Sequence, residues 1–112
     1  MIKKTFPMAL TTSYQTIYTV PNGKRTELVL VFVGNTAGSN GGFSLRVYNK
    51  ASDTTLQVFS GYTVTASQYF EIGGQPNQFI ALAEGDRIEM TADKTMTAML
   101  SVIEHNDVIK GG

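Results

Sequence analysis

Cysteine and tryptophan are both absent from this 112-residue chain. Without cysteine, neither a disulfide nor a thiolate metal site is available, so stability must come from the core or from a partner chain. Nine Lys and Arg residues balance nine Asp and Glu residues, and no run of like charges exceeds two. A chain without a basic patch lacks the electrostatic footprint of polyanion binding, and we expect no nucleic-acid partner.

Long hydrophobic runs are also missing. The longest covers residues 28–33, whereas a helix that spans a bilayer needs about 20 apolar residues. Near the start of the sequence, Pro7 interrupts the residues that follow Lys3 and Lys4, so we expect no secretion signal. These features predict a soluble chain with no membrane partner. Its length suits one domain that buries somewhat over ~60% of its unfolded surface.

Strand-like segments separated by turns fill most of the sequence, and no segment keeps a helical period long enough to cross between parallel strands. Pro21-Asn22-Gly23, the Gly61 position and Gly85 are typical of a turn, a bulge and a left-handed turn residue. The spacing predicts an all-β fold, an antiparallel β-sandwich or jelly roll of about eight strands. The expected strands cover residues 14–20, 25–33, 43–48, 56–64, 69–72, 79–82, 87–91 and 96–104.

The first residues differ from the rest of the chain. Residues 1–13 lack an alternation of strand length, and Pro7 is unsuited to a central ladder. We therefore expect an N-terminal arm over residues 1–13, followed by a single β-sandwich domain over residues 14–112. The glycine-rich residues 34–42 are expected to form a mobile loop.

Two of the expected strands, residues 25–33 and 96–104, are apolar on both faces. One face of such a strand can pack on the core, and the other can meet neighbouring subunits or another protein. The alternative is a central strand covered by the chain's own loops. Apolar side chains of the arm and of these two strands are the candidate oligomer or partner contacts: Phe6, Met8, Leu10, Val29, Val31, Val33, Met99 and Ile103.

Residues that carry chemistry are few. His105 is the only histidine, and no neighbouring residues suggest a triad or a metal site around it. Glu84 and Asp86 flank Gly85, where turn carboxylates usually cap backbone N–H groups. We expect no catalytic residues, no metal and no cofactor, and therefore no enzyme.

Tyrosine offers a second possibility, because its ring gives a large contact area with a polar tip. Tyr48, Tyr62 and Tyr69 are candidates for a carbohydrate- or receptor-binding surface. The lack of tryptophan makes carbohydrate stacking the weaker interpretation, and packing at the margin of the core is the alternative.

Three stretches together resemble a group of small virion structural proteins of tailed bacteriophages. They are "ALTTSYQTIYTVPNGKRTELVLVFVGN" at residues 9–35, "LAEGDRIEMTAD" and "MTAMLSVIE", and they cover about half of the chain. Such proteins tend to open with a Thr-Thr, Gln-Thr-Ile-Tyr-Thr, Pro-x-Gly-Lys pattern and to close with a Gly-Asp hairpin and a similar last strand. The glycine-rich residues 34–42 depart from this pattern. The Gly-Asp hairpin is also similar to one in tumour necrosis factor-like jelly rolls, which are trimers.

The resemblance implies a non-enzymatic structural protein of the virion, assembled in the host cytoplasm. Its most favoured role is a capsid decoration, or cement, protein that binds and stabilises the assembled shell. Its partners would be other copies of itself, as a homo-oligomer for which a trimer is favoured, and the major capsid protein or another virion protein. A tail or neck component of the virion is the alternative within the same class.

Overall fold

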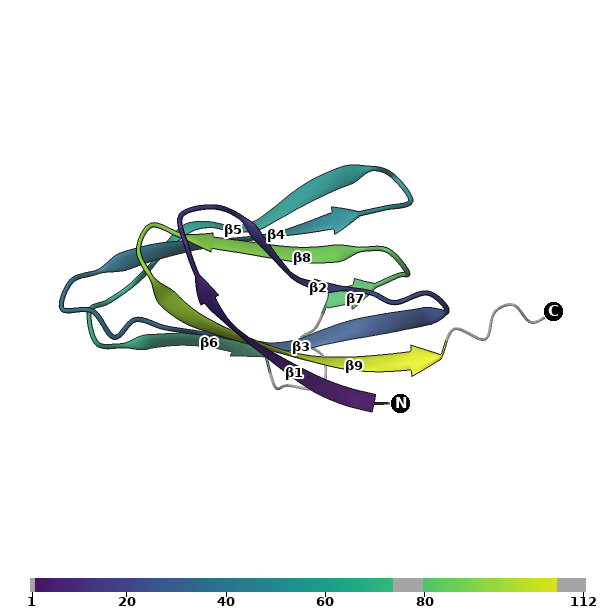
Figure 1. The fold of residues 1–112 in the computed structure, drawn as a ribbon, viewed down its shortest axis with the longest axis horizontal. Coiled ribbons are helices and arrows are strands. Elements are labelled where there is room, and N and C mark those ends of the chain that lie inside the picture. The colour runs from purple at the N-terminus through teal and green to yellow at the C-terminus, as the bar shows by residue number, and fades with distance from the viewer. Residues whose placement is uncertain (1, 74–79, 107–112) are drawn as a thin grey trace.

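The structure, a computed structural model, describes residues 2–73 and 80–106. Two antiparallel sheets pack face to face (Figure 1), so the predicted all-β sandwich is confirmed. No helix that could cross a membrane occurs among these residues. The strands are β1 (Ile2–Leu10), β2 (Gln15–Thr19), β3 (Lys24–Gly34), β4 (Gly41–Asn49), β5 (Thr54–Val64), β6 (Tyr69–Gly73), β7 (Ile80–Leu82), β8 (Arg87–Ala92) and β9 (Met96–Asn106).

The strand order is that of a jelly roll. One sheet runs β1-β9-β3-β6 and the other β2-β8-β4-β5. Successive strands alternate between the two layers, except that β4 and β5 share one sheet and β6 and β7 share the other. The short strand β7 joins the first sheet by pairing with the part of β3 that β6 leaves free. The eight predicted strands therefore correspond to β2 through β9, except that residue 79 of the segment 79–82 lies outside the described residues.

The first nine described residues form a strand, which corrects the predicted arm. Strand β1 pairs along its whole length with β9, from Ile2 opposite Glu104 to Leu10 opposite Met96. Pro7 has no backbone N–H to donate. It is accommodated because β1 is an edge strand, where the missing donor does not interrupt hydrogen bonding between two central strands. Residues 2–10 thus belong to the sandwich.

The core lies between the two sheets and is built by alternate residues of each strand. Along β4, Phe43, Leu45 and Val47 are buried, whereas their neighbours are more exposed. Each large aliphatic or aromatic side chain buried in this way contributes about 1.5–3 kcal/mol. Fully buried side chains from both layers include Leu10, Val33, Phe43, Leu45, Ile88, Met90, Met96, Leu100 and Val102.

A β-bulge at Val29 changes the phase of strand β3. Leu28 pairs with Val102, but Leu30, two residues later, pairs with the adjacent Ser101, so one extra residue is accommodated on β3. A one-residue insertion moves every later side chain to the opposite face of the sheet. As a result, Leu28 and Val31 both face the core, while Leu30 and Phe32 face outward.

Turn positions with special backbone conformations agree with the sequence. Gly23, Gly61 and Gly85 all have positive φ angles, of 76°, 61° and 84°. At Gly61 the pairing of β4 with β5 shifts register, which confirms the predicted bulge.

The glycine-rich connection between β3 and β4 has a buried anchor that the sequence did not suggest. The Asn35 side chain is buried, and its Nδ2 donates to the carbonyls of Ser39 and Val64, each at 3.0 Å. Its Oδ1 accepts from the Ala37 N–H at 3.0 Å. The Asn35 amide therefore holds in place a loop that we expected to be mobile. Gly41 and Gly42, which we assigned to the same loop, belong to β4.

Candidate binding surfaces

The outer face of the β1-β9-β3-β6 sheet carries an apolar strip. Most of it lies on the central strands β3 and β9, where Phe32 pairs with Met99. The Phe32 ring stacks on Tyr69 of the edge strand β6, with centroids 5.2 Å apart. Among the described residues, no other element covers this face. Tyr69 is exposed, and the other members are partly exposed. We define the outer strip as Leu30, Phe32, Tyr69, Met99 and Ile103.

Only Met99 and Ile103 of the predicted contact residues belong to the outer strip. Val31, Val33 and Leu10 are buried in the core, which corrects their assignment to a partner surface. Phe6 and Met8 are half-buried and pack against the core. Val29 occupies the bulge. The reason for the error on β3 is the bulge itself, because strict alternation from Leu28 assigns Leu30 and Phe32 to the core.

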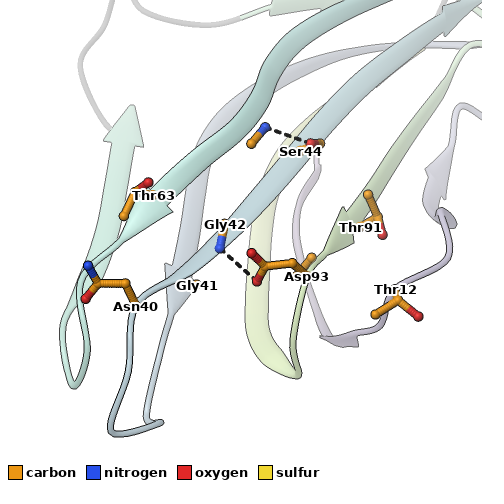
Figure 2. A pocket seen from close by; sticks show the side chains of 10 residues that line it. Thr12, Asn40, Gly41, Gly42, Ser44, Thr63, Thr91 and Asp93 are labelled. Atoms are coloured by element: carbon orange, nitrogen blue, oxygen red, sulfur yellow. Dashed lines mark hydrogen bonds between the residues drawn. The ribbon is translucent and has the colours of Figure 1, made fainter.

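A polar groove lies on the outer face of the second sheet (Figure 2). Its volume is about 540 Å³. Gly42 donates its backbone N–H to Oδ1 of Asp93 at 2.9 Å, and Gly61 donates its N–H to the Ser44 hydroxyl at 2.9 Å. Hydroxyl, amide and carboxylate groups line the groove: Thr12, Asn40, Ser44, Thr63, Thr91 and Asp93.

Glycine and a bulge create this hollow. A Cβ atom on Gly42 would lie 3.4 Å from Asp93 Oδ2 and 3.5 Å from the Gly61 carbonyl oxygen. Any side chain at position 42 would therefore occupy the groove. The bulge at Gly61, whose φ is 61°, leaves open space beside β4.

Beyond the groove, the same face carries a cluster of paired charges. Glu89 accepts from Arg46 at 2.6 Å and from Arg87 at 3.1 Å. Burial raises the pKa of the Glu89 carboxyl, but the hydrogen bonds from both arginines outweigh this effect and hold the pKa below its ordinary value. The two guanidinium groups stack on the rings of Tyr14 and Tyr48.

The three tyrosines considered for carbohydrate stacking do not form one surface. Tyr48 lies on the outer face of the second sheet and donates to Asp53 at 2.7 Å. Tyr62 packs among the rings of Phe43, Phe59 and Phe70. Tyr69 lies on the outer strip. The structure therefore does not bring the three tyrosines together, and Tyr62 agrees with the alternative of packing at the margin of the core.

A buried polar network fastens both sheets together near one end of the sandwich. Tyr18 on β2 donates to Oε2 of Glu104 on β9 at 2.6 Å and shares a hydrogen bond with Thr26 on β3 at 2.9 Å. Lys4 on β1 contacts the other Glu104 oxygen at 3.1 Å. The hydrogen bond from Tyr18, and then Lys4, hold the pKa of Glu104 below its ordinary value against the effect of burial. Burial, with the Glu104 carboxylate, raises the pKa of Tyr18 to about 12.

Glu104 should make stability depend on pH in the acid range. Its folded pKa is lowered, so its stabilisation is complete above the unfolded value of about 4.3 and is lost as pH falls through the folded value. Replacing Glu104 with Gln should cost about 1–3 kcal/mol at pH 7, and the difference from the wild type should shrink below about pH 4.5. Urea unfolding at several pH values measures this difference. A difference that stays constant from neutral to acid pH contradicts the assignment.

The two turn carboxylates considered for chemistry have structural partners, whereas His105 Nε2 has no hydrogen-bond partner among the described residues. Asp86 is buried and accepts from the N–H groups of Lys50 and Ala83, each at 2.9 Å, and Glu84 accepts from the Gly23 N–H at 2.9 Å. The expected capping role of these two carboxylates is confirmed. His105 lies 3.6 Å from Glu27 on the outer face of the first sheet. Residues 2–73 and 80–106 contain no group of three His, Asp or Glu residues placed to hold a metal ion.

Fold and surfaces together define the class of the protein: an antiparallel jelly-roll sandwich with an apolar strip on one outer face and a polar groove on the other. Comparison of the chain with protein-family models, with curated proteins and with solved structures finds no match in any of the three.

Proposed function

We propose that this protein is a non-enzymatic structural component of a tailed-phage virion, a capsid decoration protein that attaches to the assembled shell through the outer strip. The observation that carries the proposal is an apolar strip at the centre of a sheet, on a face that no described element covers. Its partner is the major capsid protein, and the chain also associates with itself as a trimer. The sequence resemblance to phage virion proteins supports this assignment, and jelly rolls commonly serve as viral capsid domains.

The size of the strip's face suits a specific interface. Strand β9 has 11 residues, so at about 3.3 Å per residue the face is about 36 Å long, and four strands at about 4.8 Å make it about 19 Å wide. A partner covering it would bury about 700 Å² on this chain, close to the ~800 Å² per partner of a standard interface. The apolar strip would form the centre of that interface, with Lys3, Glu27 and Glu71 at its margin.

Stabilisation of the shell would then follow from mass action. A protein that binds only the assembled state favours that state, and each covered apolar side chain adds to the binding free energy. In a trimer, three strips would bind neighbouring subunits of the shell at the same time. Modest individual contacts would then produce a high overall avidity. This mechanism needs no cofactor.

Polar substitution on the outer strip is expected to weaken attachment without unfolding the chain. Replacing Phe32 with Ser removes the central ring of the strip, and binding to purified capsids of the encoding phage should fall at least about tenfold. The matched control is Tyr48→Ser, which removes a partly exposed, stacked ring from the opposite sheet and should leave binding unchanged. Co-sedimentation with capsids measures the binding, and sedimentation equilibrium of the free proteins follows their association state.

Wild-type binding by a folded Phe32→Ser protein would show that the strip is not the attachment surface. Ile103→Ser provides a second test at the other end of the strip, in case Phe32→Ser unfolds. A gene beside that of the major capsid protein supports decoration, whereas a gene among tail genes supports the tail or neck role. A chain that is not encoded by a phage contradicts the proposal altogether.

A further inference from the structure

The polar groove on the second sheet has the features of a ligand site that the attachment role does not use. It lies on the opposite face of the sandwich from the outer strip, so both can be occupied at once. From its chemistry we infer that the groove binds a neutral polyhydroxyl ligand, a saccharide, through Asp93, Asn40, Ser44 and Thr63.

Hydrogen-bonding capacity remains on several groups that face the groove (Figure 2). Asp93 uses Oδ1 to accept from Gly42, which leaves Oδ2 as an acceptor toward the hollow. Asn40 accepts from the Ala66 N–H through Oδ1 at 3.0 Å, so its NH₂ group is left as a donor. Ser44 accepts from Gly61 and keeps its own proton to donate.

This mixture of donors and acceptors selects the class of ligand. Sugar hydroxyls both donate and accept, so they can bind the Asp93 carboxylate and the Asn40 amide at the same time. An anion such as phosphate would be repelled by Asp93, because no Lys or Arg side chain lines the groove and the nearby Lys94 donates to the Ser39 hydroxyl instead. An apolar ligand would leave the lining hydroxyl and amide groups without partners.

The shape of the groove agrees with a small saccharide. Its volume of about 540 Å³ falls within the usual range for small-molecule sites. The floor is backbone at Gly42 and Gly61, which present no side chains, and a sugar ring can therefore approach the strands closely there. Arg46 and Arg87 lie on the same face, but both are held by Glu89 rather than turned to the groove.

Chemical-shift titration of the ¹⁵N-labelled full chain tests this site. The probes are glucose, galactose, N-acetylglucosamine, maltose and chitobiose, each added to tens of millimolar, with inorganic phosphate as the charged comparison. At least one saccharide should produce saturable shifts at the amides of Gly41, Gly42, Gly61 and Asp93, and phosphate should produce none. Saccharides with no effect on these amides, or shifts confined to the amides of Phe32 and Tyr69, would overturn the inference.

Two substitutions separate binding from folding. Asp93→Asn keeps an Oδ1 acceptor for Gly42 but replaces the free carboxylate oxygen with a donor, so saccharide affinity should fall about tenfold or more. Thr55→Val removes an exposed hydroxyl from the same sheet outside the groove and should leave affinity unchanged. An Asp93→Asn protein that is folded and binds the saccharide as tightly as the wild type contradicts the site. None of these outcomes depends on whether the outer strip attaches to a capsid.

Discussion

Replacing Phe43 with Ala is expected to lower the free energy of unfolding by about 3–5 kcal/mol, the usual cost of removing a buried aromatic ring. Phe43 is only 1% exposed and lies at the centre of an aromatic cluster that joins the two sheets. Its ring centroid lies 5.3 Å from that of Phe70 on β6 and 5.5 Å from that of Phe59 on β5. The cavity left by the ring would remove contacts with both layers at once.

Thermal unfolding measures this loss, and the midpoint should fall by at least about 10 °C. Leu56→Ala on the neighbouring strand β5 is the control, because Leu56 is 68% exposed and its truncation should change stability by no more than ~0.5 kcal/mol. If Phe43→Ala and Leu56→Ala unfold at the same temperature, the aromatic cluster is not part of the core between the two sheets.

Replacing Gly73 with Ala should be nearly as costly, at about 3 kcal/mol or more, because two separate effects oppose a side chain there. The φ angle of Gly73 is 111°, a conformation that residues with a Cβ rarely adopt. An added Cβ would also lie 2.2 Å from the carbonyl oxygen of Val29 and 2.9 Å from the Cα of Leu30. Since both contacts are with backbone, the strand itself would have to move.

Urea unfolding checks this loss, with Gly38→Ala as its control. Gly38 has no atom within 4 Å of an added Cβ, so its substitution should be almost neutral. Equal stability of the two variants would show that β6 does not approach the Val29 bulge as closely as the structure indicates. That approach matters for the proposed attachment surface, because the bulge turns Leu30 and Phe32 outward.

The sequence predicted the eight strands from β2 to β9 because their alternation and turn residues are local signals. Gly23, Gly61 and Gly85 stand where backbone conformations with positive φ are needed, and each position was predicted from its neighbours alone. The missing strand, β1, has no such signal. Its side chains are mostly exposed, and Pro7 is tolerated only because β1 pairs with β9 as the edge strand of the sheet. That edge position depends on the whole sheet and not on the residues near Pro7.

The candidate surfaces were harder to predict, since they depend on register and on distant residues. Six apolar residues in a row show that β3 has two apolar faces, but nothing in the row shows that Val29 is a bulge. The bulge is a shift in the register of β3 with β9, and Gly73 of β6 lies beside it. Met99 could be assigned to the outer face because the side chains of β9 alternate between the two faces of the sheet without a bulge.

The polar groove has no compact sequence signal either. Thr12, Asn40, Thr63 and Asp93 come from four separate parts of the chain and meet only in the folded sheet. A clue was present in the glycines at positions 41, 42 and 61, which we interpreted as loop and bulge residues. Sequence alone did not show that they line a common hollow.

Hydroxyl-radical footprinting of the chain on purified capsids tests attachment through the outer strip most directly. Aromatic and sulfur-containing side chains on both outer faces report on their own exposure. The account predicts that oxidation of Phe32, Tyr69 and Met99 falls when the chain binds the capsid, whereas oxidation of Tyr14 and Tyr48 on the opposite sheet does not change. Protection of the two tyrosines on the second sheet, with Phe32, Tyr69 and Met99 oxidised as in the free protein, would contradict it.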